Sequence, residues 1–394
     1  MASKYRSVLS VPGARRLFAT ALVARLPQGM APLAILLLVR DATHSYAIAG
    51  LAVGAEAFAT AGCAPLLGRL VDRFGRRRVL GPLACAQAAV YALLVVAAEA
   101  HAGAVALIAL AALAGALLPP IAPVVRVVLR EVIRDPDVRE TAYSLDAVIQ
   151  EVLWMSGPLF VAVLIAVASP AVAVALLGVL CMGGTILFLR SPLIRASSAV
   201  PGRAARASAL ASPELRALLG PVALTGTGLG AIEVGLPALA IHAGSRPASG
   251  VLLALWSVGS MAGGLWYGSR TWRSPLVRRY RILLAFAVIC TLPLIAARSL
   301  TAGVVCSVLA GLTIAPVFSC QWALVGRSVT AGAETEAFTW VSAALIGGLA
   351  AGSALGGAVI APAGVSGPFV IACLASMLAA LLAVGFRVPA RQPA

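Results

Sequence analysis

Four ionisable side chains lie deep within long apolar runs of this sequence. They are Arg25, Glu56, Glu151 and Glu233. An ionisable group near the centre of a bilayer costs at least about 2.5–3.5 kcal/mol, so a membrane protein keeps one mainly for binding or for proton transfer. If these runs span a membrane, the four residues are the first candidates for chemistry.

Glu56 is the clearest candidate for proton coupling. It stands in "AVGAEAFATAG", where its neighbours are small and apolar. Such surroundings favour the neutral form of a carboxyl, and coupling requires a carboxyl that can gain and lose a proton. The alternatives are a fixed ion pair with Arg25 or a protonated, inert side chain. Glu151 and Glu233 are the other proton-coupling candidates, with a hydrogen-bonding role at an outer gate as the alternative for Glu233.

Arg25 and Gln28 are candidates for a substrate cavity. Both belong to the run that contains "RLPQGM", in which Pro27 and Pro32 can bend a helix and free carbonyl groups toward a cavity. Arg25 could hold an anionic group of a substrate or influence a nearby acid. The alternative is that its long side chain reaches back to the membrane surface.

Two acids share a single run, residues 141–168. Asp146 and Gln150 are four residues apart and face the same way on a helix, whereas Glu151 is turned aside and lies deeper. We therefore expect Glu151 to face a cavity. We expect Asp146 to join a structural cluster near the cytoplasmic side of the membrane, where Arg126 also lies.

The composition indicates a membrane protein. The 394 residues are 61% hydrophobic and 11% charged, with a mean hydropathy of +1.00, whereas soluble domains average about 25% charged residues. The net charge of +16 would suggest nucleic acid for a soluble chain. Here the arginines separate apolar runs, as the positive-inside rule expects, and we predict no nucleic-acid partner.

The cysteines and histidines do not indicate a cofactor. All seven cysteines lie in apolar runs without a CxxC pair, which favours helix packing over disulfides or metal binding. The histidines fall between runs, on the predicted outer side. We predict neither a metal nor any other cofactor.

Twelve apolar runs reach the length of about 20 residues that a membrane-spanning helix needs. They are 15–39, 46–67, 79–98, 103–126, 141–168, 170–190, 215–241, 247–267, 281–298, 302–325, 335–361 and 367–386. If the N-terminus is cytoplasmic, the outer segments contain only Arg40, Arg246 and Arg298 among the basic residues. The positive-inside rule then places both termini in the cytoplasm, for a multi-pass protein of the inner membrane.

The chain divides into two similar halves. The longest polar stretch predicts a cytoplasmic linker at 191–213 between six-helix bundles at 1–190 and 214–394. "ETAYSLD", from Glu140 to Asp146, resembles "ETEAFTW", from Glu334 to Trp340. A repeat of six helices is typical of transporters whose halves rock about a central site.

The densest charge of the chain lies in "GRLVDRFGRRR", which begins at Gly68 and follows the second run. This segment resembles the loop 2–3 signature of the major facilitator superfamily, with matches at Gly68, Asp72, Arg73, Gly75, Arg76 and Arg77. "GPLFVAVL", with Gly157 and Pro158, resembles the family's Gly-Pro motif C of antiporters, and Arg126 stands where the family often keeps an arginine. Apolar, arginine-rich chains with "RLPQGM" look like actinobacterial members.

The resemblance implies an all-α fold with twelve membrane helices in two pseudo-symmetric six-helix bundles. In an alignment of the two repeats, tryptophans of the second half fall on charged residues of the first. The aligned pairs are Glu56 with Trp256, Asp72 with Trp272, Arg126 with Trp322 and Asp146 with Trp340. Trp256, Trp322 and Trp340 are therefore candidates for an aromatic wall of the cavity, with a lipid-facing position as the alternative.

The sequence hypothesis for function is secondary transport of a small molecule by alternating access, in a monomer that needs only substrate, protons and the bilayer. Its preferred form is proton-coupled export of an amphipathic drug-like compound or metabolite. One alternative is uptake of a small organic anion anchored by Arg25. The others are a non-transporting sensor or scaffold and a membrane-embedded enzyme, but no GxSxG, HExxH or GxxxxGK[ST] motif supports enzymatic or ATP-driven chemistry.

Asp72 has a separate predicted role. An acid among arginines at the cytoplasmic mouth is expected to be a gate latch, binding either the fourth and fifth helices or the eleventh. We expect Arg126 and Asp146 to lie at this mouth as well. The second half has Trp272 in place of this acid and is expected to lack the latch.

Overall fold

The computed structural model describes residues 2–196, 208–245, 248–329 and 332–385, and all regular structure in these ranges is helical. Helices suit the apolar sequence because they satisfy every backbone polar group within one segment. In chain order the helices are α1 (Ala2–Ser10), α2 (Ala14–Thr43), α3 (Tyr46–Phe74), α4 (Arg76–Glu99), α5 (Ala104–Ala116), α6 (Ile121–Val132), α7 (Pro136–Val167), α8 (Pro170–Leu189), α9 (Pro192–Ala196), η1 (Ala209–Ala211), α10 (Pro213–His242), α11 (Ala248–Gly268), α12 (Leu276–Ala296), α13 (Leu300–Gly311), α14 (Ile314–Ser328), α15 (Glu334–Ala363), η2 (Gly364–Ser366) and α16 (Gly367–Val384).

Eleven segments of the described chain are long and apolar enough to cross a membrane. The sequence predicted twelve. The difference lies at the end of the chain, where α15 and α16 form one 51-residue segment, Glu334–Val384, interrupted by the 3-10 turn η2. The chain is therefore a multi-pass membrane protein.

Prolines break one predicted span into two helices. Residues 103–126 form α5 and α6, which are separated at Leu117–Pro120, where Pro119 and Pro120 supply no N–H groups. This break places Arg126 on a short helix of its own, α6. The linker predicted at 191–213 contains α9 and η1, and its central residues 197–207 lie outside the described part.

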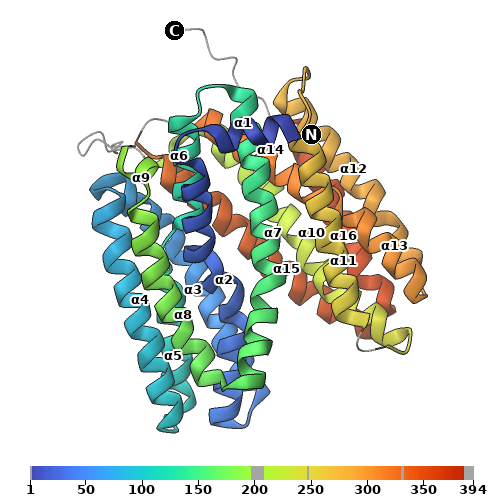
Figure 1. The fold of residues 1–394 in the computed structure, drawn as a ribbon. Coiled ribbons are helices and arrows are strands. Elements are labelled where there is room, and N and C mark those ends of the chain that lie inside the picture. The colour runs from blue at the N-terminus through green and yellow to red at the C-terminus, as the bar shows by residue number, and fades with distance from the viewer. Residues whose placement is uncertain (1, 197–207, 246–247, 330–331, 386–394) are drawn as a thin grey trace.

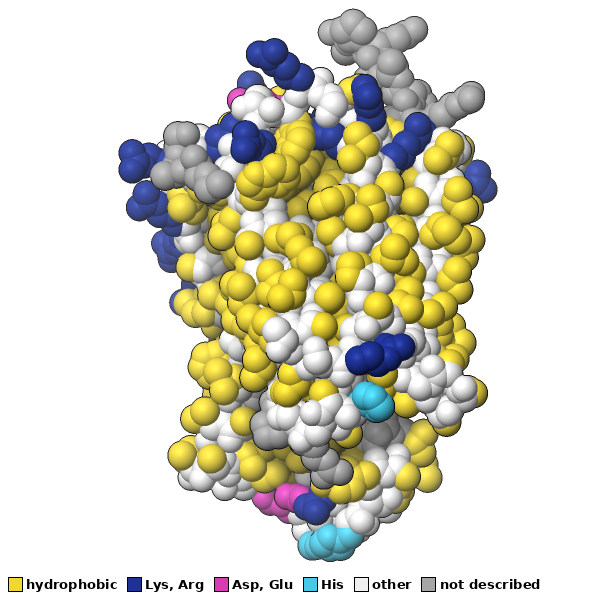
Figure 2. Space-filling view, turned by 90° about the vertical axis from the view of Figure 1, so that its right-hand side faces the viewer, with side chains coloured by type: hydrophobic (Ala, Val, Ile, Leu, Met, Phe, Trp, Pro, Cys, Tyr) yellow, Lys and Arg dark blue, Asp and Glu magenta, His cyan; other side chains and the backbone are white. Residues whose placement is uncertain are grey.

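The helices form two groups that lie side by side, α2–α8 in the N half and α10–α16 in the C half (Figure 1). Figure 1 shows α1, α6 and α9 at the same end of the molecule, which we call the terminal end; the opposite end is the distal end. Figure 2 shows hydrophobic side chains over most of one lateral face, with lysines and arginines gathered toward the terminal end.

The buried apolar side chains form three clusters. The largest contains residues of both halves, such as Leu129, Tyr143, Phe338 and Val341. Each of the other two lies within one half. The cluster of the N half contains residues between Met30 and Leu177, and the cluster of the C half contains residues between Ala231 and Ala372. The halves thus share a core at the terminal end and have separate cores distally.

Small residues allow the long helices to approach closely. The segment "GGLAAGSALGG" of α15 carries such residues at four-residue spacing. A Cβ on Gly348 would lie 1.9 Å from the Ala223 carbonyl oxygen of α10, and one on Gly352 would lie 1.9 Å from that of Thr227. Only glycine fits such a backbone contact.

Candidate functional site

Two arginines share one aspartate at the centre of the molecule. Arg25 Nη1 of α2 lies 2.5 Å from Asp146 Oδ1 of α7, and Arg126 Nε of α6 lies 3.0 Å from Asp146 Oδ2. The Arg25 guanidinium also donates to the side-chain oxygen of Gln150. All four side chains are at most 7% exposed. Two cations and one anion leave this cluster with one net positive charge.

The three helices bring this cluster together through their spacing. Asp146 and Gln150 lie one helical turn apart on α7 and both face Arg25, as the four-residue spacing predicted. Arg126 reaches the same carboxylate from the short helix that follows the Pro119–Pro120 break. Arg25 therefore points across the molecule and not back to the membrane surface.

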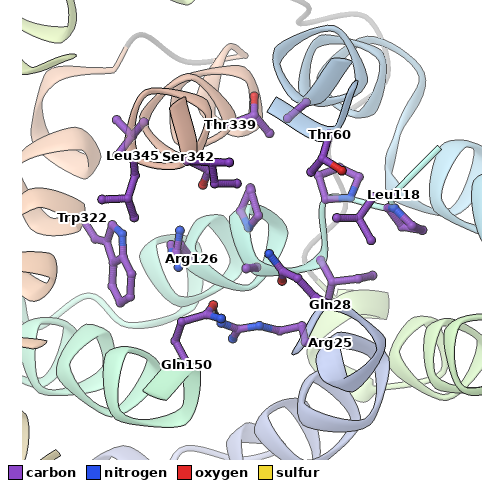
Figure 3. A pocket seen from close by; sticks show the side chains of 18 of the residues that line it. Arg25, Gln28, Thr60, Leu118, Arg126, Gln150, Trp322, Thr339, Ser342 and Leu345 are labelled. Carbon is purple, nitrogen blue, oxygen red and sulfur yellow. Dashed lines mark hydrogen bonds between the residues drawn. The ribbon is translucent and has the colours of Figure 1, made fainter. Parts of the chain in front are cut away.

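A cavity of about 90 Å³ lies against the cluster, and we call it the inner compartment (Figure 3). Arg25, Arg126 and Gln150 form one side in Figure 3, while Ser342 and Leu345 of α15 face them. Asp146 is fully buried behind the arginines and does not line the cavity. A solute here would meet donors on one side and apolar groups, including Leu118, Phe318 and Leu345, on others.

Trp322 completes the arginine side of the inner compartment. The Arg126 guanidinium carbon lies 3.6 Å from the centre of the Trp322 ring, within the range of a cation–π contact. Trp322 in turn stacks on Phe318. The two other candidate tryptophans, Trp256 and Trp340, line neither this compartment nor the next; both are partly buried against the shared core.

A second cavity of about 310 Å³, the outer compartment, adjoins the first. The two share the lining residues Gln28, Thr60, Leu118, Trp154 and Ile346, so they lie next to each other between the halves. Gln28 therefore lines both compartments. The outer compartment is lined mainly by apolar side chains.

Glu56 and Glu233 line the outer compartment from opposite halves. Glu56 accepts a hydrogen bond of 3.5 Å from Thr60, which also donates to the Gly115 carbonyl over 3.2 Å. Glu56 is 8% exposed, whereas Glu233 is exposed to the cavity. Neither forms an ion pair with a described residue, so the alternative of a fixed Glu56–Arg25 pair is not what the structure contains.

Glu151 lies elsewhere, between α7 and α11. It is 5% exposed and lines neither compartment. Its polar neighbour is Ser260 of α11. The cavity-facing position expected for Glu151 is thus occupied by Gln150, because the adjacent residue on a helix points about 100° away.

Asp72 joins the two halves at the terminal end. Its carboxylate accepts hydrogen bonds from the backbone N–H groups of Thr335 (3.0 Å) and Glu336 (2.8 Å) at the start of α15. Arg69 binds Glu336 over 3.0 Å, and a Cβ on Gly68 would lie 2.9 Å from Glu336 Cα. Asp72 therefore caps α15, which corresponds to the eleventh predicted run. This is the second of the two partners that were expected for Asp72. Arg126 and Asp146, which were expected beside it, lie in the central cluster.

A second contact between the halves joins α7 to α11. Ser144 donates to the Gly264 carbonyl, and Thr141 donates to the Gly268 carbonyl over 2.9 Å. Beside them, Glu140 forms a buried ion pair with Arg279 of α12. Tyr267 donates to the same carboxylate.

The helix α1 crosses this second contact. The Tyr5 hydroxyl donates to the carbonyls of Leu265 (2.9 Å) and Gly264 (3.2 Å), and Lys4 donates to the Arg270 carbonyl over 2.9 Å. Burial raises the pKa of the Tyr5 hydroxyl. The amino-terminal segment thus binds the C half directly.

The remaining motif residues have local roles. Gly75 has φ 89°, a left-handed conformation that favours glycine, between α3 and α4. Arg76 binds Glu131 of α6 over 2.6 Å, while Arg73 and Arg77 are exposed.

Gly157 and Pro158 of the second motif stand at the α2–α7 crossing. A Cβ on Gly157 would lie 2.4 Å from the Gly29 backbone. Pro158 lines the outer compartment.

Sequence reasoning missed the partners at the terminal end. Tyr5, Glu140, Arg279 and Glu336 were not among the candidate residues. The repeated Glu-Thr of "ETAYSLD" and "ETEAFTW" was the available signal, because both copies stand where the halves meet.

Comparisons with known proteins agree with this architecture. The sequence model described as Major Facilitator Superfamily matches residues 17–332. The human organic anion transporter MFSD10 (TETRAN) has a similar structure, with a TM-score of 0.75, 18% identity and coverage of 94% of this chain and 99% of that one. A bacterial homologue of the iron transporter ferroportin in an outward-facing state gives a TM-score of 0.73, 12% identity and coverage of 94% and 98%. No curated protein matches the sequence.

Proposed function

This chain belongs to the major facilitator superfamily, and from that premise we propose that it is a proton-coupled secondary active transporter of a small amphipathic molecule. Transport by alternating access requires a central cavity and two ends that close in turn. The family membership and the similar transporter structures indicate a transporter and not an enzyme.

The observation that carries the proposal is the asymmetry of the space between the halves. The Asp72–α15 and α7–α11 contacts join the halves at the terminal end, where they also share a core. Toward the distal end each half has its own core and the outer compartment lies between the halves, while the inner compartment borders the shared core. This arrangement suits one state of an alternating-access cycle.

The membrane arrangement that we propose has twelve crossings in two six-helix bundles, residues 1–190 and 214–394, joined by a linker at 191–213. A 51-residue helical segment is too long for one crossing, since about 20 residues suffice, so Glu334–Val384 would cross twice. The arginine-rich terminal end would face the cytoplasm. The structure would then be outward-facing, in an inner membrane, and active as a monomer.

Proton coupling is assigned to the outer compartment. Glu56 and Glu233 face this space without a cationic partner among the described residues, so either can change charge without breaking an ion pair. A carboxyl that titrates in such a cavity can make the conformational equilibrium depend on pH. Glu151, between α7 and α11, is a further proton site that would respond to separation of the halves.

Different observations support each of the two possible directions of transport, export and uptake. Export in exchange for protons, our sequence hypothesis, is supported by the apolar lining and by the tight Gly157–Gly29 crossing. Uptake of an organic anion is supported by Arg25 at the cavity and by the fold shared with MFSD10. If the substrate is exported in exchange for protons, substrate and protons would compete for binding. If the substrate is taken up together with protons, the two would bind at the same time.

The test is proton-driven flux in vesicles. The substrate would be the first compound that stabilises the purified protein in a thermal-shift screen. We expect Glu56→Gln to reduce proton-driven flux of that compound at least about tenfold, because glutamine keeps the shape but carries no exchangeable charge. Glu99→Gln is the control, since Glu99 is exposed at the end of α4. Absence of flux under any proton gradient would instead favour a sensor or scaffold, and unchanged flux in Glu56→Gln would remove Glu56 from the coupling.

A further inference from the structure

We infer that the inner compartment binds one negatively charged group of the substrate, a carboxylate-type monoanion, between Arg25, Arg126 and Gln150. The inference rests on the proposed transport function and names the chemical class of its substrate. It follows from the charge of the cluster, from its unused donors and from the lining opposite.

The charge of the cluster is not balanced by the protein. Asp146 is the only acid in contact with Arg25 and Arg126 among the described residues, and it is shared by both. The inner compartment itself has no acidic lining residue in this part of the chain. Because an uncompensated buried charge is costly, a ligand that supplies one negative charge would be strongly favoured over a neutral or cationic one.

Donors at the compartment have no partner. Arg25 Nε and Gln150 Nε2 are buried and form no hydrogen bond with any described residue. The side-chain oxygen of Gln150 is already occupied by Arg25, which fixes its amide so that the nitrogen is the free group. Buried donors without acceptors are rare in folded proteins, and both belong to side chains that line the compartment, where a carboxylate would supply acceptors.

The side of the compartment away from the arginines defines the rest of the ligand. Leu345 faces the arginines in Figure 3, and Phe318 and Leu118 also line the space. An anionic head bound at the arginines therefore leaves an apolar or aromatic body against these side chains. A small aromatic carboxylate satisfies both sides at once.

The inference also bears on the direction of transport. The outer compartment, which adjoins the anion site, contains the carboxyls of Glu56 and Glu233. A bound anion and protons on these carboxyls would favour each other, since protonation removes negative charge beside the anion. This cooperative binding matches uptake together with protons.

Three probes with the same phenyl and two-carbon skeleton test the inference: phenylacetate, phenethylamine and phenethyl alcohol. Binding is measured by calorimetry on the full-length purified protein. We expect phenylacetate to bind at least about tenfold more tightly than the other two, which corresponds to about 1.4 kcal/mol. Failure of phenylacetate to bind, or equal or tighter binding of the amine, would overturn the inference.

Gln150→Glu is the decisive variant. It is nearly isosteric, its carboxylate would still accept from Arg25, and it cancels the single positive charge. We expect phenylacetate affinity to fall at least about tenfold while the protein remains folded. Arg25→Gln should have the same effect and leaves the Arg126–Asp146 pair intact.

The matched control is Arg40→Gln, which removes an equal charge from an exposed pair with Asp41 and should not change the affinity. Unchanged phenylacetate affinity in Gln150→Glu would contradict the anion site. If phenylacetate binds as expected but no gradient moves it across vesicles, the anion site stands and the proposed transport fails. If the amine or the alcohol is bound and carried instead, transport stands and the anion site is wrong.

Discussion

Two contacts close the terminal end, and they occupy equivalent places in the repeat but use different chemistry. Where α3 meets α15, charges dominate: Asp72 caps the start of α15, and Arg69 binds Glu336. Where α11 meets α7, hydroxyl groups of Ser144 and Thr141 donate to backbone carbonyls of α11. Each contact also contains an ion pair across the halves, which is partly exposed in the first (Arg69–Glu336) and buried in the second (Glu140–Arg279).

Both contacts nevertheless use the same repeated dipeptide. Glu140–Thr141 and Glu334–Thr335 stand at the starts of α7 and α15, and each glutamate pairs with an arginine of the other half, Arg279 or Arg130. The repeat thus preserves where the halves meet and one acid at each place. The remaining contacts have diverged, with Trp272 stacked on Tyr267 in the position that corresponds to Asp72.

One measurement can compare the two contacts. Ala337 of α15 is fully buried at the terminal end. A cysteine in its place would react with a membrane-permeant maleimide only when this end opens, after correction for the same protein without that cysteine. The labelling rate then reports the population of the opened state.

Glu140→Gln is expected to have the largest effect. In the closed state it leaves the buried Arg279 without its carboxylate partner, whereas opening would let water reach the guanidinium. Loss of one partner of a buried pair costs about 3 kcal/mol, so the labelling rate should rise by about two orders of magnitude. Glu131→Gln is the control, because its pair with Arg76 lies within the N half. An equal rise in both variants would mean that the α7 contact does not close this end.

Asp72→Asn is expected to have an intermediate effect. Asparagine keeps one acceptor for the start of α15 but loses the second acceptor and the charge. A charge-assisted hydrogen bond contributes about 1.5 kcal/mol, so labelling should rise about tenfold. Asp41→Asn, in an exposed pair, should leave the rate unchanged. An effect of Asp72→Asn greater than that of Glu140→Gln would reverse the ranking of the two contacts.

The fold and the candidate site were only partly predictable from the sequence. The helical fold followed from the length and polarity of the apolar runs, and the Asp72 segment followed from its motif. The four-residue spacing placed Asp146 and Gln150 on one face, which is the face that meets Arg25. These features could be predicted because each depends on the sequence of one helix or one short segment.

Partners across the two halves could not be predicted in the same way. Nothing near Glu140 in the sequence indicates Arg279, because the pair depends on how the halves pack in one state of the cycle. The sequence also did not indicate that Arg25 joins Arg126 at Asp146, because that contact depends on how α2, α6 and α7 pack. Trp256 was expected at the cavity, but it packs, partly buried, against the shared core and against the core of the C half.

Tyr5→Phe tests the smallest contribution, from α1. The Tyr5 hydroxyl reaches the α11 carbonyls from the amino-terminal helix, so it adds an N-half donor to the α7–α11 contact and to no part of the α3–α15 contact. Loss of one partly exposed hydrogen-bonding group costs about 0.7 kcal/mol, so labelling at Ala337→Cys should rise about threefold. Tyr46→Phe is the control, since Tyr46 is exposed at the start of α3. Tyr5→Phe combined with Glu140→Gln should give less than the product of the separate effects, because both act on one contact, whereas its effect should multiply with that of Asp72→Asn. The opposite pattern would show that α1 acts through the charged contact instead.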